Sequence, residues 1–197
     1  MKIVFATNNE HKIAEVKAAL PQQLSIITLK EAGINIDIPE PHATLEENAA
    51  EKARTIFSLT QLNCFSEDTG LEVAALNGEP GVHSARYAGE ASSSQQNIAK
   101  LLGNMRSMED REAQFRTVIF LIFGGKEYHF QGVCRGAISK YPMGTEGFGY
   151  DAVFIPEGAS RTFGEMSLEE KNRYSHRRKA VDKLVAFLNQ SQVKLGI

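Results

Sequence analysis

The sequence lacks the features that define membrane-spanning, secreted and zinc-binding proteins. No apolar run reaches the length of a membrane span, and no secretory hydrophobic region opens the chain. The two cysteines, Cys64 and Cys134, do not have the close spacing of zinc ligands, so we expect both to be reduced core residues of a cytoplasmic protein. The five histidines include no pair four residues apart, which argues against a helical zinc site.

The charge balance and the length set further limits. A formal net charge of −2 argues against a surface that binds duplex nucleic acid. With 197 residues, of which 42% are hydrophobic, the chain can bury roughly 70% of its unfolded surface without disulfides. Since the chain contains no internal repeat and no low-complexity linker, we expect a single α/β domain over residues 1–197.

Hydrophobic periodicity predicts an alternation of strands and helices. Thr44 and Ser167 begin capping boxes, and Gly124-Gly125 separates two apolar runs that should form a hairpin and make the sheet mixed. The expected strands are residues 2–6, 24–29, 34–38, 63–67, 71–75, 113–123, 127–138 and 152–155. The expected helices are residues 10–20, 45–62, 93–104, 168–173 and 178–190.

The first strand runs through a polar loop, Thr7-Asn8-Asn9, into a helix that carries Lys12. Such a junction directs backbone N–H groups and the positive end of the helix dipole beyond the strand, where a phosphate would be stabilised. The loop has neither the Walker A pattern nor the dinucleotide-binding glycine pattern. Many α/β proteins begin in this way, so the junction alone also fits a purely structural turn.

Two acids, Glu67 and Asp68, follow a strand pattern and precede a Thr69-Gly70 pair that we expect to form a turn. Neighbouring residues of a strand point to opposite faces, so only one of the two acids should face a ligand crevice. Upstream, Glu40 lies between two prolines. Asp68 and Glu40 could hold magnesium, which needs one or two carboxylates plus substrate phosphates; alternatively, they are an ordinary turn acid and loop acid.

Two further segments carry groups suited to a nucleotide. Three glycines surround Phe148 in residues 144–151, where a mobile backbone could lay the ring against a planar ligand; a glycine-rich turn with a buried Phe is the alternative. Residues 170–179 are strongly basic and place Ser175, His176 and Arg177 at an expected break before the last helix, where backbone N–H groups can bind anions. The alternative for this run is a solvated helix face.

Together, residues 4–188 resemble the inosine triphosphate pyrophosphatase family. The most specific marks are Phe-Gly-Tyr-Asp at residues 148–151 and Ser-His-Arg at 175–177, supported by Glu47-Asn48-Ala49 with Lys52-Ala53-Arg54 and by the Gly81–Tyr87 segment. The resemblance implies an elongated mixed sheet flanked by helices and bent into two lobes, with the active cleft between them, and usually a homodimer. It also implies magnesium-dependent hydrolysis of inosine, deoxyinosine and xanthosine triphosphates to monophosphate and pyrophosphate, without nucleic acid or membrane as partner.

The resemblance assigns roles residue by residue. Asp68 is the implied activator of water and, with Glu40, the implied metal ligand. The implied substrate-binding residues are Thr7, Asn8, Asn9, Lys12, Lys52, Thr69, Phe148, Gly149, Tyr150, Asp151, Lys171, His176 and Arg177. The chain departs from the family pattern at Asn8, where glycine is usual, and in residues 41–49 after Glu40. It also has Glu67-Asp68-Thr69-Gly70 where Asp-Asp-Ser-Gly is usual, a variant also found in the family. Asn tolerates a positive φ better than most residues, so we expect the first loop to survive at some conformational cost.

Two questions of function stay open at this point. A 6-oxo purine would be selected either by the Arg177 side chain or by neighbouring backbone N–H groups, because adenine would turn a donor toward them. The alternatives to the whole assignment are a Maf-type nucleotide pyrophosphatase, whose arginine-rich opening loop is missing here, and a nucleotide-sensing module that binds without turnover.

Overall fold

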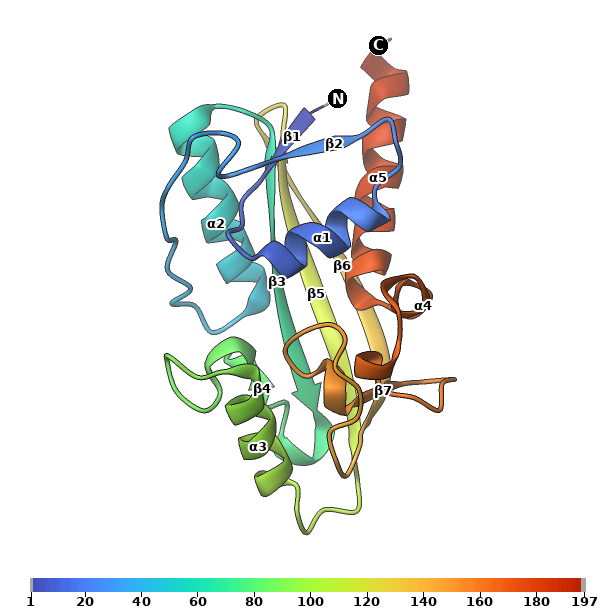
Figure 1. Cartoon of the computed structure of the whole chain (residues 1–197). Helices are drawn as coiled ribbons and strands as arrows, with labels where there is room; N and C mark the ends of the chain where they lie inside the picture. The colour runs from blue at the N-terminus through green and yellow to red at the C-terminus, as the bar shows by residue number, and fades with distance from the viewer. Residues whose placement is uncertain (1, 196–197) are drawn as a thin grey trace. The chain divides into compact units, whose positions relative to one another are not determined.

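A seven-stranded mixed sheet carries the fold (Figure 1). The computed structural model describes residues 2–195, with side chains for residues 2–191. The strand order is β2-β1-β3-β5-β6-β7, and β4 lies beside β3. Strand β1 is parallel to β2 and β3, whereas β4 is antiparallel to β3 and β7 is antiparallel to β6. The expected mixed α/β fold, with helices flanking the sheet, is therefore confirmed.

The helices and most of the strands follow one another in the order that the periodicity indicated, and the short strand β4 is an addition to it. The strands are β1 (Lys2–Phe5), β2 (Ser25–Thr28), β3 (Cys64–Val73), β4 (Pro80–Gly81), β5 (Glu112–Phe123), β6 (Lys126–Ile138) and β7 (Phe154–Pro156). The α-helices are α1 (Glu10–Ala19), α2 (Leu45–Thr60), α3 (Ser94–Asn104), α4 (Leu168–Asn172) and α5 (His176–Leu195). Within residues 2–195, no helix combines the length and the apolar character needed to cross a lipid bilayer.

Three expectations about the elements are wrong. Residues 34–38 do not form a strand; their alternating isoleucines are partly buried against the core, but their backbone does not pair with a strand. The strands expected at 63–67 and 71–75 are one strand, β3, without a turn between them. Helix α5 begins at His176, so His176 and Arg177 lie in its first turn rather than before it.

The chain divides into two compact units. The first contains Met1–Asp68, Thr117–Gly132 and Arg177–Ile197, and the second contains Thr69–Arg116 and Val133–His176. Each unit has hydrophobic clusters made only of its own residues. The expectation of a single domain over residues 1–197 stays a prediction.

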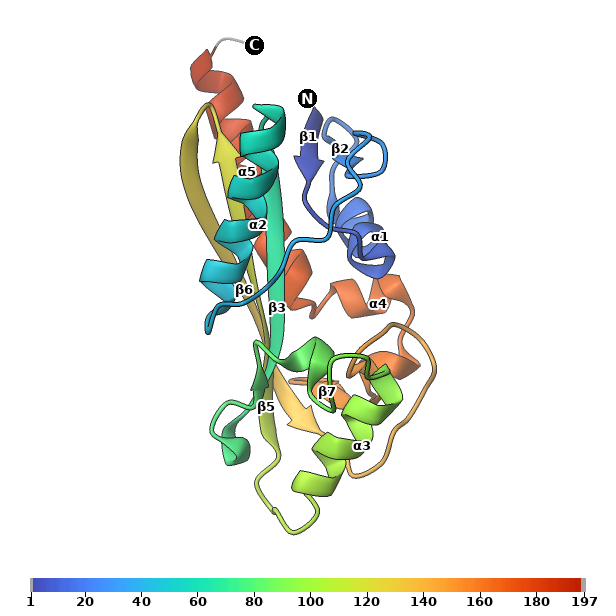
Figure 2. The ribbon, with the colours of Figure 1, turned by 90° about the vertical axis from the view of Figure 1, so that its left-hand side faces the viewer.

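In the first unit, helices cover both faces of the strands. Along β1 and the residue after it, Ile3 and Phe5 pack into one cluster with residues of α1 and α5, whereas Val4 and Ala6 pack into another with residues of α2. This alternation is the period of two of a strand buried on both faces. Figure 2 shows α1 and α2 on the two sides of β1 and β3.

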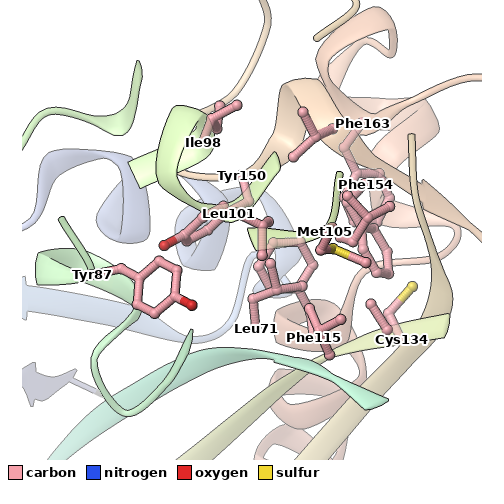
Figure 3. Close-up of a cluster of buried hydrophobic side chains, with 14 of the residues drawn as sticks. Leu71, Tyr87, Ile98, Leu101, Met105, Phe115, Cys134, Tyr150, Phe154 and Phe163 are labelled. Carbon is pink, nitrogen blue, oxygen red and sulfur yellow. The ribbon is translucent and has the colours of Figure 1, made fainter. Parts of the chain in front are cut away.

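The core of the second unit is aromatic (Figure 3). Phe115 of β5 makes an edge contact with the ring of Phe154, 4.7 Å between centroids, and both pack near Phe163. Leu101 and Met105 close the core from α3 and its end. Such ring pairs contribute beyond the area that they bury, and they hold β7 and the segment after it against β5.

Both cysteines lie in these cores, as expected. Cys64 and Cys134 are buried and form no disulfide. The Cys64 thiol donates to the carbonyl of Ala53 at 3.3 Å, and burial raises the pKa of this thiol to about 12. A thiol with this pKa stays protonated and weakly reactive near neutral pH.

Gly70 explains why the Thr69-Gly70 pair is not a turn. A Cβ atom at residue 70 would lie 2.6 Å from the carbonyl oxygen of Gly81, because β4 approaches β3 closely at this point. Ser84 secures the approach, since its hydroxyl accepts from the Leu71 N–H at 2.9 Å and donates to the Gly81 carbonyl at 2.6 Å. The glycine serves a close backbone contact inside a strand.

Replacing Gly70 by Ala should therefore lower the free energy of unfolding by about 1–3 kcal/mol, the usual cost of overpacking, in urea titrations followed by circular dichroism. Gly103→Ala is the matched control, because residue 103 lies in α3 and an alanine methyl group there would have no neighbouring atom within 4 Å. That change should leave stability unchanged or raise it by up to about 1 kcal/mol. Equal effects of the two substitutions would contradict the close contact.

Candidate functional site

The loop after β1 is fixed by its own side chains. Asn9 is the N-cap of α1, and its side-chain oxygen accepts from the Lys12 N–H at 3.1 Å. The Asn9 N–H donates to the hydroxyl of Thr7 at 3.2 Å. A helix N-terminus held in this way keeps its first N–H groups and its positive dipole end beside Lys12, which suits an anion.

Asn8, the departure from the family pattern, causes no backbone strain. Among the described non-glycine residues, positive φ occurs at Gln61 and Asn77 and not at Asn8. Its side-chain amide donates to the carbonyl of Ile36 at 2.9 Å. The expected conformational cost is thus absent, and the asparagine instead ties the loop to the irregular segment before Glu40.

The neighbouring acids Glu67 and Asp68 contact different cations. Glu67 lies 2.9 Å from the ammonium of Lys12 on α1, whereas Asp68 lies 3.6 Å from the ammonium of Lys52 on α2. Because α1 and α2 contribute to clusters on opposite faces of the strands, the two carboxylates point in opposite directions. The alternation expected from the sequence is confirmed.

Lys52 lies between two carboxylates and a carbonyl. Its ammonium pairs closely with Glu40, donates to the backbone oxygen of Glu67 at 2.9 Å, and lies near Asp68. Glu40 and Asp68 therefore face one positively charged point. Two carboxylates directed at one cation are the part of a magnesium shell that a protein commonly supplies, with phosphates and water completing it.

Burial and neighbouring charges shift the ionisation of this cluster. Burial raises the pKa of Asp68 above its ordinary value, and Glu40 and Glu67 add to this effect while Lys52 and Lys12 oppose it. Burial alone would lower the pKa of Lys12, but the carboxylates of Glu67 and Asp68 outweigh it, so the pKa of Lys12 is raised. Lys12 consequently stays charged at neutral pH.

Arg177 is buried among acids. Its Nε and Nη2 donate to the two oxygens of Glu67 at 3.1 and 3.4 Å, and its Nη1 pairs with Glu15 of α1. Burial opposes the charge of Glu67, but Arg177 and Lys12 outweigh it and lower the pKa of Glu67 below its ordinary range. All three nitrogens of the guanidinium group are thereby engaged by carboxylates of the same unit.

In the second unit, a buried ion pair holds the segment around Phe148. Lys171 of α4 lies 2.6 Å from Asp151 Oδ2, with side chains that are 3% and 4% exposed. The same carboxylate oxygen accepts from the Phe148 N–H at 2.9 Å. The Lys171 ammonium lies 5.2 Å from the centre of the Phe148 ring and 5.3 Å from that of Phe163, a cation–π arrangement.

Gly147 permits this arrangement. Its φ is +74°, and a Cβ atom there would clash with the carboxylate of Asp151. Only glycine adopts this backbone conformation without a side chain entering the space of the ion pair. Gly147 therefore makes room for the ion pair in this turn, and the mobile backbone expected from the sequence stays a prediction.

Other predicted residues of the second unit belong to its framework. Tyr150 is buried, and its hydroxyl donates to the carbonyl of Ser84 at 2.9 Å, which joins the segment around Phe148 to the Gly81–Tyr87 segment. The ring of His176 stacks on Phe115 with 4.6 Å between centroids. Thr69 is half-buried where β3 enters the unit, and Gly149 is half-buried beside Phe148.

The structure thus gathers the predicted residues into two groups, each within one unit. Glu40, Lys52 and Asp68 meet in the first unit, which also carries Lys12 and the loop before it. Phe148, Asp151 and Lys171 meet in the second. Sequence reasoning missed Glu15, which is buried on α1, and gave Glu67 no role; no local pattern singles out Glu15.

The fold and the two clusters define an α/β protein with a polar loop before its first helix and paired acids and lysines beside it. A sequence model of the Ham1 family matches residues 3–187. The chain belongs to the Ham1 family, which confirms the resemblance found in the sequence.

Individual relatives match over nearly their full length. The dITP/XTP pyrophosphatase of Flavobacterium johnsoniae is 47% identical over 192 residues, covering 98% of this chain and 100% of that protein. The dITP/XTP pyrophosphatase of Porphyromonas gingivalis is 48% identical over 188 residues, covering 95% and 97%. The solved structure of the Staphylococcus aureus Ham1 protein is similar with a TM-score of 0.88 at 39% identity, covering 97% of this chain and 100% of that one.

Removing the cation of the buried pair should be costly. Lys171→Met leaves the Asp151 carboxylate buried without its ammonium partner, so we expect the free energy of unfolding to fall by about 3–5 kcal/mol in urea titrations. Adding Asp151→Asn should recover part of the loss, because the uncompensated charge is then gone.

Arg161→Met is the control, because the Arg161–Glu170 pair has side chains that are 51% and 39% exposed. It should cost about 0–1 kcal/mol. A small effect of Lys171→Met, similar to that of Arg161→Met, would mean that the Asp151 charge is solvated in solution.

Proposed function

We propose that the protein hydrolyses deoxyinosine, inosine and xanthosine triphosphates to the monophosphate and pyrophosphate and so removes these purines from the nucleotide pool. Relatives named dITP/XTP pyrophosphatase, 40–48% identical over nearly the whole chain, support this substrate class. The observation that carries the proposal is the cluster of the first unit, in which Lys52 joins Glu40 and Asp68.

The phosphate chain would be bound by the first unit. A triphosphate carries about four negative charges, and phosphoryl transfer is catalysed mostly by positioning and by offsetting such charge. Lys12, Lys52 and the N-terminus of α1 supply the positive charge, and Thr7, Asn8 and Asn9 shape the loop. Thr69 would contact the substrate next to Asp68.

Asp68 would orient the attacking water and accept its proton. Attack at the α-phosphorus breaks the bond between the α-phosphorus and the bridging oxygen, and pyrophosphate leaves with the electron pair. The water's oxygen stays on the monophosphate. No side chain needs to form a covalent intermediate, so Asp68 acts as a general base.

The residues present fit magnesium. Glu40 and Asp68 would hold it, since both carboxylates already face one ammonium group. Among residues 2–195, no three side chains of His, Cys, Asp or Glu gather as a ligand set, so substrate oxygens and water would complete the shell. When bound, the ion would offset phosphate charge and polarise phosphoryl oxygens.

The base would be bound by residues of the second unit. Phe148 offers a stacking surface, and Gly149, Tyr150, Asp151 and Lys171 shape the turn that presents it. Stacking is tolerant of base identity, so selection for a 6-oxo group requires donors.

Two kinds of donor near the start of α5 could supply this selection, the Arg177 side chain and the backbone N–H groups beside it. Arg177 already donates to Glu67 and Glu15, which favours the backbone N–H groups of the first turn, at His176 and Arg177, over the guanidinium side chain. The N-terminus of a helix presents its backbone N–H groups and the positive end of its dipole to an oxygen of a ligand.

The alternatives fit less well. A Maf-type pyrophosphatase would require an arginine-rich opening loop, but residues 7–9 are Thr-Asn-Asn. A nucleotide-sensing module binds without turnover, so it would not need an acid such as Asp68 beside a second carboxylate, Glu40, that could help to hold a metal ion. As in the family that the sequence resembles, we propose a homodimer that acts on the cytoplasmic nucleotide pool; light scattering of the purified protein tests the dimer.

The products of the reaction test the proposal. With magnesium, deoxyinosine triphosphate in ¹⁸O-labelled water should give labelled monophosphate and unlabelled pyrophosphate, measured by mass spectrometry. Adenosine triphosphate should be turned over far more slowly under the same conditions, because sites built for a hydrogen-bonding group can reject its mismatch by about 10⁴-fold or more. Orthophosphate and a diphosphate as products would refute the assignment.

Asp68→Asn should lower kcat by about 10²–10⁴-fold while the substrate still binds, because the amide cannot accept the proton of water. Turnover is measured by pyrophosphate release, and binding by calorimetry with a non-hydrolysable deoxyinosine triphosphate analogue. Asp182→Asn is the control, since Asp182 forms an exposed pair with Arg178 on α5 and should leave kcat unchanged. Near-normal turnover by Asp68→Asn would remove Asp68 from the mechanism.

A further inference from the structure

Four charged side chains form a buried group in the first unit: Lys12 and Glu15 of α1, Glu67 of β3 and Arg177 of α5. The two acids and two bases balance in charge. Glu67 is the centre, because it accepts from Arg177 through both of its oxygens and also pairs with Lys12. This centre has no role in the function proposed above.

Glu67 is held in one orientation. Arg177 Nε donates to Oε2 and Nη2 lies near Oε1, so the guanidinium group faces the carboxylate with two nitrogens. Two hydrogen bonds from one guanidinium group fix the orientation of a carboxylate in addition to compensating its charge. The side chain of Glu67 is fully buried, at 0% exposure, so water does not compete for its oxygens.

Lys12 is held differently from Arg177. Its side chain is 15% exposed, and among the described residues Glu67 is the acid within ion-pair distance of its ammonium, at 2.9 Å. An ammonium group has three donors, so one engaged by Glu67 leaves the others able to meet a ligand oxygen. Lys12 is therefore the member of the group that reaches toward solvent at the start of α1.

Without an anchoring acid, a lysine side chain would not hold its ammonium group in one position. Its side chain has four rotatable carbon–carbon bonds and loses entropy whenever a ligand fixes it. An anchor that fixes the ammonium before the ligand arrives removes part of that cost from binding. Stability alone does not explain a buried ion pair, because apolar residues of the same volume often give equal or greater folding stability.

We propose that Glu67 is a positioning residue that fixes the ammonium of Lys12 for the phosphate chain, and that Arg177 fixes Glu67 in turn. The inference rests on the proposed function, because it assigns the ligand of Lys12 as phosphate. It gives the first acid of the Glu67-Asp68 pair a task distinct from that of Asp68. The guanidinium side chain of Arg177, on this view, acts through Glu67 rather than on the base.

Binding of inorganic tripolyphosphate tests the coupling without turnover. The four proteins of a double-mutant cycle are the wild type, Lys12→Met, Glu67→Gln and the double variant, and Kd is measured by calorimetry. In the wild-type background, Glu67→Gln should weaken binding by about tenfold, the worth of a charge-assisted hydrogen bond. In the Lys12→Met background the same change should weaken binding less than about twofold.

Glu15→Gln is the matched control. It removes one carboxylate from the same buried group and from Arg177 but leaves Glu67, the acid that pairs with Lys12, in place. It should lower the thermal midpoint as Glu67→Gln does, while the Kd for tripolyphosphate stays within about twofold of the wild type. Stability and binding are thereby separated.

Three results would overturn the proposal. Equal effects of Glu67→Gln in both backgrounds would mean that Glu67 supports folding and not Lys12. Tighter binding by Glu67→Gln would mean that Glu67 competes with phosphate for Lys12. Unchanged binding by Lys12→Met would mean that Lys12 does not meet phosphate. A failure of the proposed function would instead appear as absent pyrophosphate release by the wild type, whatever the cycle shows.

Discussion

The alternation of side chains along β3 is the constraint on which the first unit depends. Glu67 and Asp68 are adjacent, and a strand sends adjacent side chains to opposite faces. Each acid therefore meets its own lysine: Glu67 meets Lys12 of α1, and Asp68 meets Lys52 of α2. Two adjacent residues thus belong to two separate clusters of charged side chains. A shift of the strand register by one residue would turn each acid toward the opposite face of the sheet.

The second unit also uses charged side chains to fix the position of a residue that would bind the ligand. Here a charge pair, Lys171 and Asp151, is almost completely buried and is balanced within itself. The pair fixes the position of Phe148. The Asp151 carboxylate accepts from the Phe148 N–H, and the Lys171 ammonium lies over the Phe148 ring. A buried pair contributes little net stability but much geometric definition, which suits a ring that is to receive a planar ligand.

Much of the fold could be predicted from the sequence, because it follows local rules. The hairpin at Gly124-Gly125 and the helix starts at Thr44 and Ser167 are confirmed, since turn glycines and capping residues act over a few positions. Two of the errors have one physical source. The alternating isoleucines of residues 34–38 report burial but not backbone pairing, and Gly70 reports a close contact with Gly81 that lies outside any local window.

The candidate site divides in the same way. The acids, lysines and glycines could be found from the sequence because their types carry the chemistry, but their partners could not. Arg177 and Glu15 are 162 positions apart, and Arg177 and Glu67 are 110 apart, so no pattern in the chain reveals that they touch. The sequence therefore assigns Arg177 to a ligand through the family's Ser-His-Arg motif, and neither carboxylate partner can be read from it. The burial of Arg177 between two carboxylates supports the proposal that its side chain positions other residues, and that Lys12, anchored by a single acid, is the cation of that group that meets phosphate.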